Sequence, residues 1–479
     1  MRARGRGGGD PPRMDEGTWD VAVVGGGNAA LVSALTAREA GARVLILERA
    51  PEASRGGNTR HTRDIRWVHE QADEYTTGAY PYQELWQDLC GLGSGPSDES
   101  LAELTVRESE SVPAWMSAHG VRWQRPLTGT LHLGRTNRFF LGGGKAVLNT
   151  YYRAAARAGI GVAYQAGVED LCLEDGTGVR LEVVTDAGWR EVRARAVVCA
   201  SGGFEANIGW LKRYWGEAAE NYHVRGTRFN DGTVLQRLLA AGAAPAGEER
   251  GFHAVAVDAR SPRFDGGIAT RLDSIPFGIV VNRSGHRFYD EGEDIWPKRY
   301  AIWGRNIAAE QDQIAYSLWD SKVQGMFLPP MYGAYRADTL PELAHQIDLD
   351  PAAVCATVAQ FNVAVDRGSG GRFDPGRLDG RSTAGLTPPK SNWAQRLDRP
   401  PYYAVPMRPG ITFTYLGVRV GADASVRRPD GSALGPVFAA GEIMSGNILS
   451  TGYLAGFGLT IGSVWGRIAG RAAAAHALR

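Results

Sequence analysis

The sequence predicts an α/β protein built around a Rossmann-like nucleotide-binding domain. Three segments predict this fold: a strand–helix–strand unit at 20–48, and two later strands that run into glycines, RAVVCASGGF (195–204) and GPVFAAGEIMSGNILSTGYLAGFGLTIGSVWGRIAG (435–470). Strands that alternate with helices form parallel sheets covered by helices. With 479 residues and an apolar content of 43%, the chain is long enough for two domains with separate cores.

The first unit carries a dinucleotide-binding pattern. The strand DVAVV (20–24) leads into GGGNAA, and the helical pattern LVSALTAREA precedes the strand RVLILE. Gly25, Gly27 and Ala30 occupy the positions of G-x-G-x-x-G/A, which provide a tight turn, close backbone approach to a pyrophosphate and close helix packing. Glu48 ends the second strand, where its carboxylate can accept hydrogen bonds from ribose hydroxyls. At this point both NAD and FAD are open.

The segment after Glu48 separates these two cofactors. RAPEASRGGNTRHTR (49–63) contains a polar glycine-rich loop, Gly56, Gly57, Asn58 and Thr59, which can follow further phosphates or the edge of a flavin. An NAD dehydrogenase has no need of such a loop. Three distant pieces that converge on one cofactor therefore favour FAD.

Composition and charge exclude several classes of function. The chain has 53 Lys and Arg against 52 Asp and Glu, so no global field would recruit nucleic acid or an acidic membrane. Its four cysteines are widely separated, which indicates neither a metal site nor a disulfide framework and favours a reducing cytoplasm. No stretch approaches the roughly 18 apolar residues of a membrane span, and residues 1–17 are expected to be a disordered tail. We expect a cytoplasmic protein with a small-molecule partner.

Together with VVNRSGHRF (280–288), the glycine-rich segments resemble the flavoprotein subunits of the succinate dehydrogenase/fumarate reductase family, which includes 3-ketosteroid dehydrogenases and soluble fumarate reductases. The resemblance covers nearly all of 18–479. One subgroup, the tricarballylate dehydrogenases, is the most similar, and the segments that carry this are GGNTRHTR (56–63), RTNRFFLGGGKAVLNTYYRAA (135–155), AVDARSPRFDGGIATRLDSIPFGIVVN (256–282) and RFYDEGEDIWPKRYAIWGR (287–305).

The resemblance implies a discontinuous FAD-binding domain, 18–250 plus 409–479, with an α+β capping domain inserted at 251–408. The Pro/Gly-rich stretches GAAPAGEERG (242–251) and PYYAVPMRPG (401–410) suit the junctions. It also implies non-covalent FAD and an enzyme that desaturates a C–C bond next to a carboxylate or carbonyl, with tricarballylate, converted to cis-aconitate, as the favoured substrate. Three alternatives stay open: a desaturase of a ring ketone or biosynthetic intermediate, a fumarate-reductase-like ene reductase, and a flavin-carrying subunit without chemistry.

Two catalytic residues follow from the resemblance. In the family, an arginine after G-x-R-F-x-[ND]-E is the active-site acid or base; here GHRFYDE (285–291) is followed by Arg299. A protonated arginine needs a relay, and Asp290, Glu291 and Glu293 are the nearby carboxylates. Without the family, 287–300 reads as a charged surface loop.

The second catalytic residue is Tyr453, which stands where fumarate reductases hold a substrate carboxylate with arginine. Tyrosine is also the residue of ketosteroid dehydrogenases, where a phenol hydrogen-bonds a ketone. Phe413 stands where the family has a substrate-binding histidine. Both departures remove a carboxylate clamp, so we expect other arginines to hold substrate, Arg60 with its neighbour Arg63 and Arg135 with its neighbour Arg138.

His61 has three open interpretations: a base, a donor to substrate, or a site of covalent flavin attachment. Of these, we expect a substrate-facing role, and a plain structural histidine stays open as the alternative. The chain shows no Fe–S cysteines, haem motif or NAD site, so electrons would leave to a separate acceptor protein or to O₂. The predicted cofactor contacts are Gly25, Gly27, Asn28, Ala29, Glu48, Arg49, Gly56, Gly57, Asn58, Thr59, Gly144, Val168, Ala200, Ser201, Gly202, Gly441, Glu442, Leu449 and Leu454.

Overall fold

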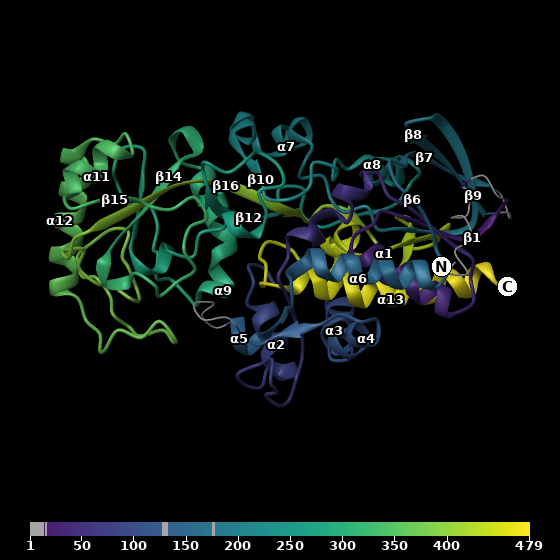
Figure 1. Ribbon diagram of the computed structural model, residues 1–479, viewed down its shortest axis with the longest axis horizontal. Coiled ribbons are helices and arrows are strands. Elements are labelled where there is room, and N and C mark those ends of the chain that lie inside the picture. Colours follow the sequence, from purple (N-terminus) through teal and green to yellow (C-terminus); the bar gives the residue numbers. More distant parts are fainter. Residues whose placement is uncertain (1–13, 15–16, 127–132, 175–177) are drawn as a thin grey trace, which may run out of the picture.

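The structure, a computed structural model, describes residue 14 and the ranges 17–126, 133–174 and 178–479, apart from the side chains of Pro297 and Arg299. The predicted tail at 1–17 lies almost entirely outside these described residues. The described chain forms two lobes along one long axis, and a long strand passes from one to the other (Figure 1).

The first lobe contains a parallel sheet that is extended by antiparallel strands. Within the described residues this sheet has eight strands, in the order β18–β19–β9–β1–β2–β6, with β8 paired to β9 and β7 to β8. Strand β1 pairs in parallel with β2 and with β9, as the nucleotide-binding prediction requires, and this confirms the α/β fold class. The strands are β1 (Trp19–Val24), β2 (Val44–Leu47), β6 (Gly161–Ala163), β7 (Gly167–Glu174), β8 (Gly178–Thr185), β9 (Gly188–Cys199), β18 (Ser425–Arg427) and β19 (Ala433–Ala439).

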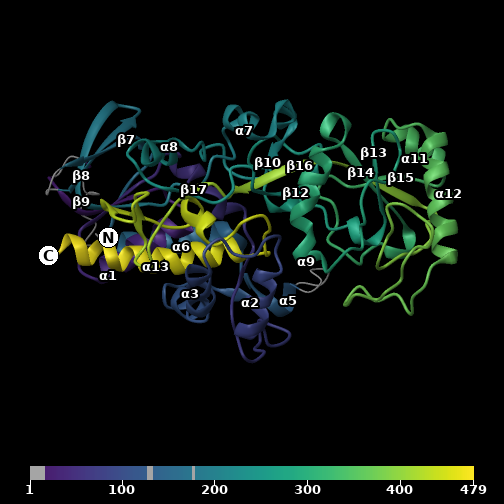
Figure 2. The same ribbon diagram turned by 180° about the vertical axis from the view of Figure 1, so that it is seen from behind.

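Helices from both ends of the chain pack against this sheet. The views in Figures 1 and 2 show α13 (Phe457–Ala477) running beside α1 (Asn28–Glu39), with α6 (Gly143–Arg157) nearby. Glycines allow α1 and α13 to touch backbone to backbone: a Cβ on Gly466 would lie 2.9 Å from Ala29 O, and one on Gly470 would lie 2.4 Å from Ser33 O. The C-terminal segment therefore completes the N-terminal unit, as its strand-then-glycine pattern predicts.

The second lobe is built on a separate, mainly antiparallel sheet. In the described chain its order is β10–β16–β14–β13, and β12 and β15 also pair with β16. Helices α11 (Leu340–Gln346) and α12 (Pro351–Arg367) cover it and enclose a second core. The strands are β10 (His223–Val224), β12 (Phe252–Asp258), β13 (Ile279–Asn282), β14 (Ala315–Asp320), β15 (Tyr335–Ala337) and β16 (Tyr402–Thr414). The division at 250 and 408 stays a prediction; β16 crosses residue 408.

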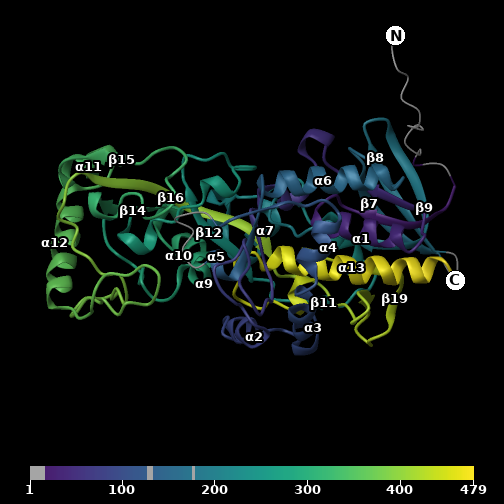
Figure 3. The same ribbon diagram turned by 60° about the horizontal axis from the view of Figure 1, so that its bottom comes forward.

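Smaller elements surround the junction of the two lobes. Figure 3 shows α2 and α3 grouped on one side of the first lobe. These elements are α2 (Tyr82–Cys90), α3 (Glu99–Ser109), α4 (Val112–Ala118), α5 (Leu133–Thr136), α7 (Ile208–Trp215), α8 (Thr233–Ala240), α9 (Trp296–Arg299), α10 (Trp303–Ala308), and the strands β3 (Asp64–Arg66), β4 (Trp123–Gln124), β5 (Asn137–Phe140), β11 (Pro245–Ala246) and β17 (Gly417–Val418).

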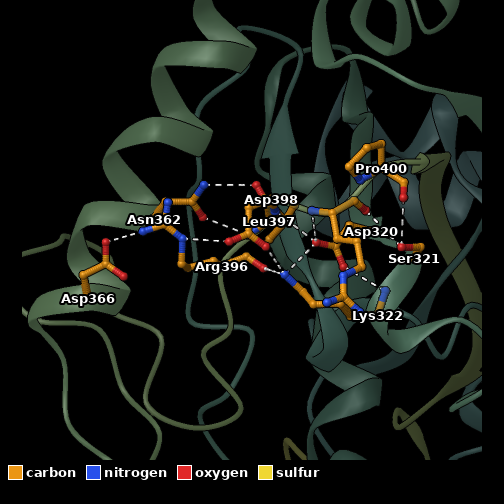
Figure 4. A network of polar contacts seen from close by, with 10 residues as sticks. Asp320, Ser321, Lys322, Asn362, Asp366, Arg396, Leu397, Asp398 and Pro400 are labelled. Carbon is orange, nitrogen blue, oxygen red and sulfur yellow. Dashed lines mark hydrogen bonds and ion pairs between the residues drawn. The ribbon is translucent and has the colours of Figure 1, made fainter.

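A polar network fastens the outer lobe together (Figure 4). Lys322 Nζ lies 2.9 Å from Asp320 Oδ2 at the end of β14, donates to Arg396 O at 2.7 Å, and bonds Asp398. Asn362 of α12 donates to Leu397 O at 3.0 Å. The network thus ties α12 and β14 to the segment that leads into β16. None of the described helices is both long and apolar enough to cross a membrane.

Candidate functional site

A deep cavity begins at the carboxyl ends of β1 and β2 and reaches the second sheet. Its empty volume is about 1490 Å³, which includes space open to solvent. Its lining runs from Val24 and Leu47, which end strands of the first sheet, to His253 and Phe413 of the second sheet, so the cavity spans both lobes. Its two ends differ in chemistry: one is lined by glycines and the other by arginines and aromatic rings.

The glycine turn after β1 forms one wall, and it has no room for side chains. Gly25 has φ +110°, a conformation that favours glycine, and a Cβ there would lie 2.4 Å from Ala200 O. A Cβ on Gly26 would lie 2.3 Å from both Glu48 Oε2 and Tyr152 Oη. The turn therefore brings bare backbone to the cavity at the point where α1 begins, an arrangement that suits a phosphate.

Glu48 organises the neighbouring loop from its buried position at the end of β2. Its two carboxylate oxygens accept the N–H groups of Ala50, at 2.9 Å, and of Gly56, at 3.0 Å. Burial raises the pKa of this carboxyl, and the backbone donors oppose that effect. The loop in turn supplies Thr59, whose Oγ1 accepts the N–H of Asn28 at 2.9 Å. Strand end, loop and helix start are thus joined by hydrogen bonds.

These residues fit a bound dinucleotide. Asn28 lines the cavity, and its buried Oδ1 has no hydrogen-bond partner among the described residues, which suits a ligand hydroxyl. The predicted cofactor contacts that line the cavity are Gly25, Gly27, Asn28, Ala29, Glu48, Arg49, Gly57, Asn58, Thr59, Val168, Ala200, Ser201, Gly202, Gly441 and Glu442.

Four predicted cofactor contacts lie behind the cavity wall instead. Gly56 is turned to Glu48, and Gly144 packs so closely on the loop that a Cβ would lie 1.8 Å from Thr59 O. Leu449 and Leu454 are buried in the core at 1% and 0% exposure. These four residues support the wall and do not line it.

A cofactor-binding test follows from the crowded turn. We expect Gly26→Ala to lose most of its bound FAD and about 1–3 kcal/mol of stability, because the new methyl group collides with Glu48 and Tyr152. The ratio of flavin to protein absorbance after purification measures the loss. Gly371→Ala is the matched control, since a Cβ there meets nothing within 4 Å. Full FAD retention in Gly26→Ala would contradict the proposed role of the turn.

Three guanidinium groups gather at the other end of the cavity, those of Arg63, Arg225 and Arg271. Arg225 donates from Nε to Thr412 Oγ1 at 2.9 Å, and burial, reinforced by Arg271, lowers its pKa to about 10. Arg271 is paired with Asp273 at 2.9 Å. Three cations therefore share a small buried volume.

The carboxylates near this cluster do not saturate it. Arg63 Nε lies 3.4 Å from Asp64 Oδ2, yet its Nε and Nη2 have no hydrogen-bond partner among the described residues. Although burial alone would raise it, Arg271 and Arg63 hold the pKa of Asp273 below its usual value. Buried charge without a partner is costly, so this end of the cavity favours an anion.

Aromatic rings complete the arginine-lined end. The His253 imidazole is stacked on the Tyr453 phenol with centroids 3.9 Å apart and planes at 7°, and Phe413 lies 5.5 Å from Tyr453. Tyr300 meets His253 edge-on at 5.4 Å. These rings form a flat wall in which polar atoms are few and fixed.

The polar atoms of that wall are uncharged donors and acceptors. Burial raises the pKa of Tyr453, whose Oη accepts the N–H of Gly458 at 3.0 Å and so keeps its own proton for another partner. Burial also lowers the pKa of His253 well below its usual value, and Arg225 and Arg271 act in the same direction. Both ring nitrogens of His253 have no partner among the described residues. A neutral phenol and a neutral imidazole thus face the cavity beside the guanidinium groups.

The predicted substrate residues divide into two groups. His61, Phe413 and Tyr453 line the cavity, and His61 Nε2 lies 3.0 Å from Asp265 Oδ1, with a pKa that burial lowers to about 4. Arg60 and Arg135 do not line the cavity: Arg60 donates to Ser54 O at 2.8 Å, and Arg135 is bonded to Glu84 and Ala79 O. Of the four arginines predicted to hold substrate, Arg63 lines the cavity and the other three do not, while Arg225 and Arg271, which were not predicted, line the cavity as well.

The predicted catalytic arginine is placed only in part. Arg299 ends α9, next to the cavity residue Tyr300, but its side chain lies outside the described residues. The carboxylates predicted as its relay make hydrogen bonds within the described residues. Glu291 accepts the Arg287 Nε–H at 3.0 Å, Asp290 accepts the N–H of Ser391 at 3.0 Å, and Glu293 accepts the Tyr289 hydroxyl at 2.8 Å. Asp273 and Asp64 are described carboxylates that do reach the arginine cluster.

Comparison with known proteins gives consistent results. The family model described as "FAD binding domain" matches residues 20–459. The NADH:fumarate oxidoreductase of Klebsiella pneumoniae (strain 342) is 27% identical over 477 residues, which cover 96% of this chain and 48% of that protein. The chain thus spans about half the length of that relative.

Two solved structures share the fold. The open conformation of a flavocytochrome c3 fumarate reductase matches with a TM-score of 0.74 and 23% identity, over 97% of this chain and 79% of that one. The 3-ketosteroid-Δ4-(5α)-dehydrogenase of Rhodococcus jostii RHA1 matches with a TM-score of 0.70 and 22% identity, over 96% of this chain and 97% of that one.

Proposed function

Because the chain belongs to the FAD binding domain family, in which its relatives are FAD-dependent oxidoreductases, we propose that it desaturates a C–C bond next to a carboxylate or carbonyl group. The favoured substrate is tricarballylate, converted to cis-aconitate, or a related polycarboxylate. The observation that carries this proposal is the cluster of Arg63, Arg225 and Arg271 at the end of the cavity. The cluster carries three positive charges beside the carboxylates of Asp64 and Asp273, and Arg63 Nε and Nη2 have no hydrogen-bond partner among the described residues. Such a cluster matches a substrate that carries several carboxylates.

The residues of the cavity suit the steps of such a reaction. Bound FAD supplies the hydride acceptor, and its glycine-lined site adjoins the arginine-lined end. The guanidinium groups of Arg225 and Arg63 hold substrate carboxylates and orient the C–C bond. The Tyr453 phenol donates to the substrate oxygen on which negative charge develops as the proton leaves. The aromatic wall excludes water from the reacting carbons.

Proton removal is assigned to Arg299 on the family pattern. A guanidinium stays protonated in most settings, so this role needs a carboxylate that receives the proton. Asp273, which accepts from Trp296 Nε1 at 2.8 Å and pairs with Arg271, is the relay that the local contacts favour. Electrons then pass from the cofactor to a separate acceptor protein or to O₂.

A second candidate is the desaturation of a ring ketone. The stacked rings of His253 and Tyr453, with Phe413 beside them, offer a flat wall and a phenol donor to a ketone oxygen. The reverse reaction, reduction of a C=C bond as in a fumarate reductase, uses the same groups. A neutral ketone, however, would bring no anion to the three guanidinium groups, and this favours the first candidate.

Anaerobic reduction of the bound flavin distinguishes these candidates. We expect tricarballylate to bleach the oxidised flavin band, succinate to do so more slowly because it has one carboxylate fewer, and neutral cyclohexanones to leave the band unchanged. The reactions with each compound use one protein preparation, and the absorbance of the flavin follows each of them. Bleaching by ketones alone would replace the first candidate with the second. Oxidation of a chemically reduced flavin by fumarate or cis-aconitate, without reduction by any acid, would favour the ene reductase.

A further inference from the structure

A pair of glutamates lies between the two ends of the cavity. Glu205 follows β9 and is fully buried at 0% exposure, while Glu442 follows β19 and lines the cavity. Their carboxyl groups converge on Gly203, where an added Cβ would lie 2.4 Å from Glu442 Oε1 and 2.9 Å from Glu205 Oε2. Within the described residues no guanidinium pairs with either carboxyl group, and Arg225, which also lines the cavity, is bonded to Thr412.

The hydrogen-bond donors around the two glutamates are distributed unevenly between their carboxyl oxygens. Glu205 Oε1 accepts from Asn230 Nδ2 at 2.8 Å and also from Asn58 Nδ2, whereas its buried Oε2 has no donor among the described residues. Glu442 Oε1 accepts the N–H of Thr414 at 2.9 Å. The Thr414 hydroxyl also donates to Glu442 Oε1, at 3.4 Å. These neighbours are neutral, so the negative charge of the pair is stabilised by side-chain amides, a backbone N–H and a hydroxyl group.

Two buried carboxyl groups that approach one point this closely, with no donor to Glu205 Oε2 among the described residues, would repel each other if both were charged, so one of them holds a proton. The two amide donors favour the charge on Glu205, so the proton belongs on Glu442. Burial and the neighbouring Glu205 raise the pKa of Glu442 well above its usual value, and burial raises the pKa of Glu205 to about 7. Tyr415 is a further titratable group that interacts with Glu442, and burial raises its pKa.

We infer that Glu205 and Glu442 form a proton-sharing pair that adjusts the reduction potential of the bound flavin, holding one proton when the flavin is oxidised and binding a second when it is reduced. Reduction adds two electrons and one proton, as hydride, to the cofactor. The negative charge that this creates favours a proton on the adjacent pair, whose carboxylate takes one proton from solvent and becomes a carboxyl. No electron passes through the pair. This inference concerns bound FAD and holds for any substrate.

The test is the midpoint potential of the bound flavin as a function of pH, measured by spectroelectrochemistry. For a two-electron couple, each proton taken up changes the potential by about 30 mV per pH unit, since tenfold in an equilibrium corresponds to about 30 mV. Below the pKa of Glu205 in the oxidised protein, about 7, the pair is already doubly protonated and we expect a slope of about 30 mV. Above that pH, uptake of a second proton doubles the slope. In Glu205→Gln the steep region disappears.

Two further measurements keep the result unambiguous. The spectrum of the reduced flavin shows whether the second proton resides on the ring, and the reduced-minus-oxidised infrared difference spectrum shows a carboxylate converted to a carboxyl in the wild type. Glu217→Gln is the control, because that side chain is 89% exposed. Equal slopes in the wild type and Glu205→Gln would overturn the inference. If Glu205→Gln does not retain FAD, the infrared difference spectrum of the wild type is the test. Absence of the new carboxyl band from that spectrum would refute the inference.

Discussion

Replacing Tyr453 by phenylalanine is expected to lower the rate of flavin reduction by substrate about 10²- to 10³-fold, the usual effect of removing one donor to developing negative charge. The phenol keeps its proton because burial raises its pKa, and its oxygen is already held by the N–H of Gly458 at 3.0 Å. Phenylalanine preserves the stack on His253, so FAD content and folding should not change. Stopped-flow absorbance under anaerobic conditions measures the rate.

The matched control is Tyr332→Phe, which removes a phenol from a ring that is 41% exposed in the outer lobe. This variant should reduce its flavin at the wild-type rate. If Tyr453→Phe also reacts at that rate, the phenol has no part in the chemistry. Together with an inactive substrate panel, that result would favour a flavin-carrying subunit without chemistry of its own.

Replacing Arg225 by glutamine is expected to weaken binding of a polycarboxylate about 30- to 1,000-fold. This corresponds to roughly 2–4 kcal/mol, the range for removing one partner of a buried charge pair. The same change should stabilise the protein in the absence of ligand. Burial first, then Arg271, lowers the pKa of Arg225 to about 10, so its charge costs the folded state about 3 kcal/mol relative to the unfolded chain. We therefore expect the Arg225 charge to favour ligand binding and to lower the stability of the ligand-free protein.

Two measurements on one sample test whether Arg225→Gln weakens ligand binding and raises stability. Titration of the flavin spectrum with tricarballylate reports binding, and thermal unfolding without ligand reports stability. Arg228→Gln is the control, three residues along the same segment with a side chain that is 63% exposed. If Arg225→Gln lowers the unfolding temperature and leaves binding intact, Arg225 is structural, and the substrate proposal loses one of its three guanidinium groups.

Local sequence patterns were sufficient for the nucleotide-binding unit and insufficient for the substrate end. The turn at Gly25, the helix after it and the acid at Glu48 are neighbours along the chain, so spacing alone predicts how they meet. Gly56 and Gly144 show the limit of such patterns. Both are glycines because backbone or side chains press on them from behind, which is a packing requirement that looks the same in sequence as a ligand contact.

The arginines of the cavity illustrate why the rest could not be predicted. Arg60 and Arg63 are three residues apart, yet the short helical turn at Gly57–His61 directs Arg60 to Ser54 while Arg63 enters the cavity. Arg225 follows β10, a strand of two residues whose existence depends on pairing with β16 almost two hundred positions later. No local period marks such a residue. Phe413 and Tyr453 were matched by family pattern, and their proximity follows from tertiary packing.

Strand β16 has a mechanical consequence. It runs without a break from Tyr402, among the outer strands, to Thr414, beside Glu442, and neighbouring strands hold it along most of that length. A strand that is hydrogen-bonded along most of its length bends little and moves as one unit. Any tilt of the outer lobe must therefore carry Thr412 and Phe413 along with it, and with them the support of Arg225. A movement of the outer lobe would then also displace the residues at the arginine-lined end of the cavity.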